Sequence, residues 1–217
     1  MERRNGMNRI LNKIRLAVNG CFRPAINRRN RNKLKNDTIT VLSSNCTGCL
    51  ILHDLGLRYN SPFVDIFIVA DDYIRLLQNF DAYMAKELQF TDTEDCPYPV
   101  AKLGDILLHC VHYKDEQEVL EKWNRRKQRM NMSNCVVIFT DRDGCTQSHL
   151  EAFDALPYAH KVVFTKTPHE DIRSSFHISG FEDKEAVGNL HRYKGWRGIK
   201  HYDAFDYVSW FNGELQL

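Results

Sequence analysis

Residues 38–57 read Thr-Ile-Thr-Val-Leu-Ser-Ser-Asn-Cys-Thr-Gly-Cys-Leu-Ile-Leu-His-Asp-Leu-Gly-Leu, and this stretch decides the fold class. The β-branched residues at its start predict a buried strand over residues 38–42, and the polar run that follows predicts a turn. Apolar residues then return at helical spacing over residues 49–57. The stretch therefore predicts a strand–turn–helix unit, from which sheets of parallel strands are built.

The same alternation of strand and helix patterns continues along the chain. Further strands are predicted at residues 63–70, 105–113, 135–140 and 161–165, and further helices at residues 71–88, 114–130 and 202–212. This order predicts an α/β fold, a three-layer sandwich with a mainly parallel sheet. Hydrophobic residues make up 43% of the 217 residues, enough to give residues 37–217 the core of a single α/β domain.

Residues 41–49 and 137–145 resemble each other. Each segment is an apolar strand, a polar turn and then Gly-Cys, and three of the nine positions are identical. The similarity is compatible with two related strand–turn–helix units. In that case the two turns that end the strands border one cleft.

The first 36 residues form a basic amphipathic arm. They carry eleven Lys and Arg residues and one acid, a net charge of +10, whereas the remaining residues carry −8. Ile10, Ile14, Ala17, Val18 and Cys21 recur at helical spacing, which predicts a helix that lies on an anionic membrane surface. There are two alternatives: the helix docks on the body by the same apolar stripe, or the arm is disordered. Residues 24–36 are predicted to be a linker.

The arm is too polar for a membrane span or a secretory signal, and the seven cysteines form no dense framework. Free thiols in a reducing compartment are the simplest interpretation, which places the protein in the cytoplasm. The basic arm then predicts a peripheral position at the inner face of the cell membrane. Nucleic acid is not expected as a partner, because the acidic body would repel its phosphates.

The turn after the first strand is the first candidate site. Cys46 precedes a helix, where backbone N–H groups lower the pKa of a thiol, so it is a candidate nucleophile. Ser44 and Asn45 are candidate donors beside it, and His112 is the candidate general base. An inert packed cysteine, a redox Cys-x-x-Cys pair with Cys49 and a zinc site are the alternatives.

Two further groups are candidates for substrate binding. Asp141 and Asp143 follow a buried strand in the D-x-D pattern that holds a divalent ion against a diphosphate, or else they cap the next helix. Trp123, Arg126 and Arg129 share a predicted helix, where the guanidinium groups form an anion clamp or a solvated basic face. No residues are assigned as a resident metal site, and the cofactor is left open.

Six short motifs occur in one order along the chain: Ser44-Asn45-Cys46-x-Gly48, Leu55-Gly56-Leu57-x-Tyr59-x-Ser61-Pro62, Tyr98-Pro99-Val100, His112-Tyr113, Lys122-Trp123-Asn124-x-Arg126-x-x-Arg129 and Lys161-Val-Val-Phe164. Together, over about residues 38–212, they resemble a bacterial family, domain-of-unknown-function family nineteen-nineteen. Its members are often labelled exopolysaccharide biosynthesis proteins. The resemblance implies a cytoplasmic role in making or decorating capsule or exopolysaccharide, and it supplies no catalytic residues.

These observations lead to three functional hypotheses. The first is a transferase that moves an acyl group from an activated donor to a hydroxyl of a carbohydrate precursor. The second is a metal-dependent glycosyltransferase that uses a sugar nucleotide, with Asp141 and Asp143 holding Mg²⁺ or Mn²⁺. The third is a non-catalytic scaffold that the arm tethers to the membrane beside the polysaccharide assembly machinery.

Overall fold

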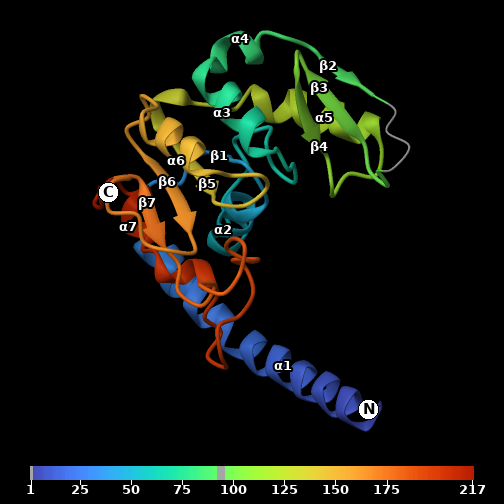
Figure 1. Cartoon of the computed structure of the whole chain (residues 1–217), viewed down its shortest axis with the longest axis vertical. Helices are drawn as coiled ribbons and strands as arrows, with labels where there is room; N and C mark the ends of the chain where they lie inside the picture. The colour runs from blue at the N-terminus through green and yellow to red at the C-terminus, as the bar shows by residue number, and fades with distance from the viewer. Residues whose placement is uncertain (1, 92–95) are drawn as a thin grey trace.

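Four parallel strands form the central sheet of this computed structural model, which describes residues 2–91 and 96–217 (Figure 1). Their order is β1-β5-β6-β7, with bounds β1 Thr40–Ser43, β5 Cys135–Thr140, β6 Lys161–Thr165 and β7 Ser175–His177. The strands predicted at residues 135–140 and 161–165 are confirmed to the residue, and the first strand begins two residues later than predicted. The α/β fold is therefore confirmed.

Helices cover both faces of this sheet, because side chains alternate between the faces along each strand. Val137 and Phe139 of β5 point into one core, where α3 (Ala70–Gln78), α5 (Glu116–Lys127) and α6 (Gln147–Asp154) contribute side chains. Val136 and Ile138 point into the other core, against α2 (Thr47–Leu55) and α7 (Tyr207–Phe211). The result is a helix–sheet–helix sandwich.

A second, antiparallel sheet was not predicted. It consists of β2 (Leu88–Phe90), β3 (Val100–Leu103) and β4 (Ile106–His109). The strand predicted at residues 105–113 is thus shorter than expected and belongs to this sheet. The strand predicted at residues 63–70 is wrong: Asp65 has a left-handed backbone (φ 62°), and only Phe67 forms a β-bridge, with His109.

Two predicted helices are interrupted. The helix predicted over residues 71–88 ends at Gln78 and resumes as α4 (Phe80–Met84), because Asn79 between them, with φ −129° and ψ 41°, lies outside the helical region. The C-terminal helix predicted over residues 202–212 is a 3₁₀ turn (His201–Ala204) followed by α7. A further 3₁₀ turn, Met132–Asn134, leads into β5.

The N-terminal helix α1 (Glu2–Lys33) is longer than expected. It continues through Pro24 and most of the residues that were predicted to be a linker. A proline inside a helix removes one backbone hydrogen bond. Here polar contacts with the body on both sides of Pro24, from Asn19 and Asn27, hold the helix in place.

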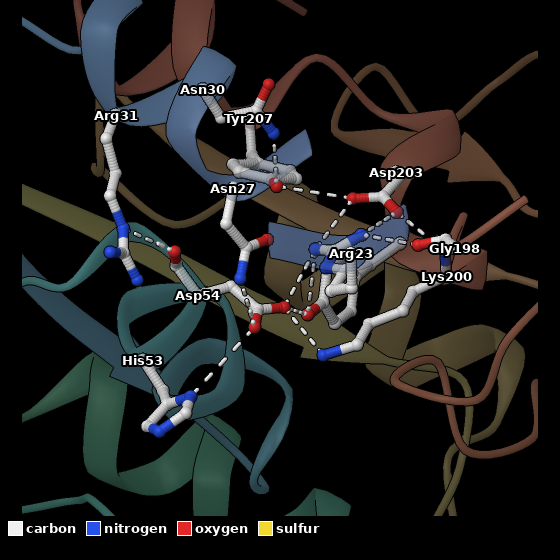
Figure 2. Close-up of polar contacts among 11 residues, drawn as sticks. Arg23, Asn27, Asn30, Arg31, His53, Asp54, Gly198, Lys200, Asp203 and Tyr207 are labelled. Atoms are coloured by element: carbon white, nitrogen blue, oxygen red, sulfur yellow. Dashed lines mark hydrogen bonds and ion pairs between the residues drawn. The ribbon is translucent and has the colours of Figure 1, made fainter. Parts of the chain in front are cut away.

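Helix α1 docks on the body through a buried polar face (Figure 2). Arg23 is 5% exposed, and its guanidinium pairs with Asp54 of α2 at 2.7 Å and with Asp203. Lys200 also contacts the Asp54 carboxylate, at 2.6 Å, and Tyr202 donates a hydrogen bond to it. Burial by itself raises the pKa of Asp54, but these donors and cations outweigh it and lower the pKa to about 2. Asp54 is therefore ionised and neutralised in place.

The apolar stripe of α1 faces away from the body. Four of its residues, Ile10, Ile14, Ala17 and Cys21, are exposed and Val18 is half-buried, while Leu11 and Phe22 beside the stripe are 50% and 51% exposed. The N-terminal half of the helix projects beyond the rest of the molecule (Figure 1). The alternative in which α1 docks by this stripe is wrong, because α1 docks by the opposite face. No helix in the described part of the chain is both long and apolar enough to cross a membrane.

Candidate functional site

A cleft of about 420 Å³ opens where the carboxyl ends of β1 and β5 meet. The two strands are parallel neighbours, with Ser43 opposite Ile138, so the turns that follow them lie side by side. Asn45 and Cys46 line the cleft from the first turn, and Arg142 and Asp143 line it from the second. The prediction that both turns border one cleft is confirmed. Ligands of open α/β sheets commonly bind at this edge.

Gly48 allows α2 to start close against β1. A Cβ atom at this position would lie 2.8 Å from the Cβ of Ser43 and 2.9 Å from a methyl group of Val41. Real side chains do not approach so closely, so a larger residue would push the helix start away from the strand. The glycine therefore fixes the position of Cys46, which is the N-cap residue of α2.

The Cys46 thiol is activated by its neighbours. A hydrogen bond from Cys49 is the largest influence on its pKa, and the charge and hydrogen bond of His112 act in the same direction. Burial opposes both, and the net result lowers the pKa of Cys46 to about 7. Because the thiolate is the nucleophilic form, this lowering favours Cys46 as the nucleophile of the cleft.

His112 reaches the cleft from the second sheet. It lies in the loop after β4, three residues beyond the end of that strand, and it lines the cleft together with Cys46. The Phe67–His109 bridge joins residues 66–68 to the second sheet, and Ile68 N donates to Ser44 O at 2.9 Å. These bonds hold the His112 loop beside the Cys46 turn.

Asn45 connects the two turns. Its amide nitrogen donates to Thr140 Oγ1 at 2.9 Å and lies 3.5 Å from Asp143 Oδ2, and its oxygen accepts from Thr47 N at 3.1 Å. Ser44 is 2% exposed, does not line the cleft, and its hydroxyl has no hydrogen-bond partner among the described residues. Asn45 therefore holds the two turns of the cleft together, whereas Ser44 is buried beneath the cleft lining.

The two aspartates of the D-x-D pattern lie in different environments. Both carboxylate oxygens of Asp141 accept backbone N–H groups at 2.7 Å, one from Lys166 and one from Val187. Burial raises the pKa of Asp141, and these two bonds oppose the rise. Asp143 has a left-handed backbone (φ 61°) and faces the cleft. Neither aspartate caps α6, whose N-cap is Thr146.

The residues of the predicted anion clamp do not line the cleft: Trp123 and Arg126 of α5 are buried, and Arg129, just after α5, is half-buried. Trp123 is 3% exposed and packs edge-on against Phe63. Arg126 is 5% exposed and donates to the Tyr113 hydroxyl at 2.7 Å. Arg129 donates twice to the carbonyl oxygen of Tyr59, at 2.6 and 3.2 Å. These side chains join α5 to the segment around residues 59–64.

Arg142, Asn189 and His191 line the cleft and were missed. Arg142 donates to the side-chain oxygen of Asn189 at 3.1 Å, and its side chain is one-third exposed. The position of Arg142 between the two candidate aspartates could have indicated from the sequence that it lies at the site. Residues 189–191 carried no such signal, because tertiary hydrogen bonds, from Val187 N to Asp141 and from Arg142 to Asn189, bring that loop to the end of β5.

The rate of alkylation of Cys46 by iodoacetamide is expected to fall as the pH falls through about 7, because protonation removes the reactive thiolate. Peptide mass spectrometry across a pH series measures this rate. Cys145 is the matched control: burial raises the pKa of its thiol to about 12, so it reacts slowly throughout. His112→Asn should move the Cys46 midpoint upward. An unshifted midpoint near 8.5, as in a free cysteine, would contradict the activation described above.

Comparison with known proteins gives a matching family and a similar protein. A family model described as "Domain of unknown function (DUF1919)" matches residues 17–212. A Haemophilus influenzae protein named "Uncharacterized protein" is 46% identical over 200 residues, which cover 92% of this chain and 97% of that protein. The family match begins within α1 and includes Arg23, so it extends beyond the motifs that start at Ser44.

Proposed function

Because the chain belongs to the DUF1919 family, whose description names no reaction, we propose a function from the cleft: transfer of an acyl group, through Cys46, to a hydroxyl of a sugar precursor. The observation that carries the proposal is the activated Cys46 thiol beside His112 in a cleft of about 420 Å³. A cleft of this volume fits one sugar ring and the end of a donor.

The proposed reaction has two steps. The Cys46 thiolate attacks the carbonyl carbon of a thioester donor, the bond to the donor sulfur breaks, and the donor leaves as a thiol after taking a proton. The sugar hydroxyl then attacks the acyl-Cys46 thioester while His112 takes its proton, and Cys46 leaves as the thiolate. Arg142, the arginine of the cleft wall, is proposed to hold an anionic group of the donor.

The two other hypotheses have less support. Metal-dependent glycosyl transfer through Asp141 and Asp143 is disfavoured because both oxygens of Asp141 already accept backbone hydrogen bonds. A scaffold without catalysis does not need a cysteine with a lowered pKa, whereas a nucleophile does. The role in exopolysaccharide or capsule synthesis rests on the family resemblance alone.

A thermal-shift panel with the full chain tests the substrate class. Acetyl-CoA at 100 times its Kd should stabilise the protein by about 2.7 kcal/mol, without added metal. The panel also holds UDP-, GDP- and CMP-sugars with and without Mn²⁺. Stabilisation by a sugar nucleotide that requires Mn²⁺, with no effect of acetyl-CoA, would support glycosyl transfer instead.

The proposal also places the protein on the inner face of the cell membrane, with α1 lying on the lipid surface. Ile10, Ile14 and Phe22 on this side of the helix are 61%, 48% and 51% exposed. Arg28 and Arg29 continue the face of Ile14 and Phe22, because seven residues make about two helical turns. Apolar side chains with adjacent basic residues suit an anionic headgroup layer.

Replacing Ile10, Ile14 and Phe22 by Ser is expected to weaken binding to vesicles that contain phosphatidylglycerol by about tenfold or more, since each side chain loses its apolar burial. Vesicle co-sedimentation measures the partition coefficient, and binding should also weaken with added salt because the basic residues contribute.

The matched control replaces Leu120, Met132 and Ile199, which are exposed outside α1, by Ser. It should bind the vesicles like the unmodified protein. Equal binding of both triple variants would contradict docking through α1. So would an unmodified protein that self-associates through the stripe and ignores lipid.

A further inference from the structure

A second thiol and a carboxylate lie directly behind Cys46. The Sγ atoms of Cys46 and Cys49 and a carboxylate oxygen of Asp65 all lie within 4.8 Å of one another. Cys49 is one helical turn after Cys46 in α2 and is 6% exposed, whereas Cys46 lines the cleft. Acyl transfer uses Cys46 and His112 and has no role for Asp65.

Asp65 is held in an unfavourable conformation at this point. Its φ of 62° lies in the left-handed region, which costs a residue with a Cβ atom about 1–2 kcal/mol. Its carboxylate forms no salt bridge in the described ranges 2–91 and 96–217, and the Cys49 sulfur lies 3.7 Å from it, with a shorter contact of 3.1 Å to the carbonyl oxygen of Cys46. Strained residues of this kind concentrate at functional sites.

We propose that Cys46 is a site of reversible oxidation by a peroxide, with Cys49 as the resolving cysteine and Asp65 as the base that takes the Cys49 proton. The proposal rests on the proposed function in one respect: a Cys46 that is bonded to Cys49 accepts no acyl group. Oxidation would then stop acyl transfer until a dithiol reduces the bond.

The chemistry balances in two steps. The Cys46 thiolate attacks one peroxide oxygen, the O–O bond breaks, and a sulfenic acid and hydroxide form; the hydroxide takes a proton and becomes water. Cys49 then gives its proton to Asp65 and attacks the Cys46 sulfur, so the S–S bond forms and the S–O bond breaks. The departing hydroxide takes the proton from Asp65. Two thiols lose two electrons in total, and hydrogen peroxide is reduced to two waters.

The thiols are suited to unequal roles. Cys46 is accessible from the cleft and its pKa is lowered, so it is the thiol that a peroxide meets as a thiolate. The hydrogen bond to Cys46, followed by burial, raises the pKa of Cys49, so Cys49 stays protonated until a base removes its proton. Asp65 is the carboxylate within reach.

Hydrogen peroxide and mass spectrometry test the proposal on the full chain. After treatment with one equivalent of peroxide, the protein should lose two hydrogens, and peptide mapping should locate the disulfide at Cys46 and Cys49. Dithiothreitol should restore both thiols. Cys49→Ser should stop at a sulfenic acid on Cys46 that dimedone traps, and Cys46→Ser should leave Cys49 reduced. Cys145→Ser is the matched control and should form the disulfide like the unmodified protein.

The Asp65→Asn variant tests the role of the base while both thiols remain. Sulfenic acid should form on Cys46 at an unchanged rate, whereas disulfide formation should slow by about tenfold, because no carboxylate takes the Cys49 proton. The proposal is overturned if Cys49 stays reduced in the unmodified protein while Cys46 oxidises, or if another pair of cysteines forms the disulfide. It is also overturned if the three groups hold Zn²⁺ tightly enough to block oxidation until a chelator is added.

The disulfide readout needs no acyl donor. A disulfide without acyl transfer would therefore refute the proposed function and support the oxidation site. An acyl-Cys46 without a disulfide would do the reverse.

Discussion

Cys46→Ala is expected to lower kcat/KM for acyl transfer by about 10³-fold or more, because it removes the atom that forms the covalent intermediate. Release of p-nitrophenolate from p-nitrophenyl acetate measures the effect without knowledge of the natural donor. The unmodified protein should show a burst of one equivalent, which records acylation of one thiol per chain. The variant should show no burst.

Cys145→Ala is the matched control for this experiment. Cys145 ends the segment that resembles the Cys46 turn, yet it does not line the cleft, and its pKa is raised to about 12. The burst should therefore persist in Cys145→Ala. His112→Asn should slow both acylation and turnover, since it removes a group that lowers the pKa of Cys46 and the proposed base. A full burst in Cys46→Ala would eliminate Cys46 as the nucleophile.

Arg23→Ala is expected to lower the free energy of unfolding by about 3–5 kcal/mol, the usual effect of removing one partner from a buried ion pair. Arg23 bridges Asp54 of α2 and Asp203, so its loss leaves two carboxylates with reduced compensation in a buried site. Lys200 still contacts Asp54, which keeps the effect within this range.

Urea unfolding followed by circular dichroism measures the loss. Arg28→Ala is the control, because Arg28 lies on the same helix, is exposed, and forms no salt bridge within the described residues. Its effect should stay within about 0.5 kcal/mol. A loss below about 1 kcal/mol in Arg23→Ala would show that α1 is not anchored through this residue.

The central sheet was predictable where its strands are short apolar runs between polar turns, as at residues 135–140 and 161–165. Residues 63–70 are just as apolar but form no strand, because Asp65 turns the backbone and Phe67 pairs only with His109. Residues 105–113 gave a real strand, β4, but the sequence could not show that it joins β3 rather than the parallel sheet. The local sequence shows which residues form a strand, but it does not show which strand they pair with.

Part of the candidate site was predictable for the same reason. Cys46 and Asp143 each follow a strand in the sequence, and the parallel pairing of β1 with β5 brings their turns together. The spacing of Arg126 and Arg129 showed that they lie near each other on a helix, but it could not show which face is buried. The guanidinium groups donate to tyrosines from other segments, Arg126 to Tyr113 and Arg129 to Tyr59.

Helix α1 shows a further limit. Its apolar stripe predicted a contact, with lipid or with the body, and no contact was predicted for the polar face. The structure docks α1 on the body by the polar face, because Asp54 and Asp203, 31 and 180 residues away, neutralise Arg23 there. No pattern within α1 could have revealed partners at such distances.

The most direct test of the central claim is the mass of the full chain after incubation with acetyl-CoA, followed by peptide mapping under conditions that preserve thioesters. The account predicts one acetyl group per chain, located on Cys46 and absent from Cys46→Ala. An acetyl group on any other residue, or none at a concentration of acetyl-CoA that stabilises the protein, would contradict the assignment of Cys46 as the acyl acceptor.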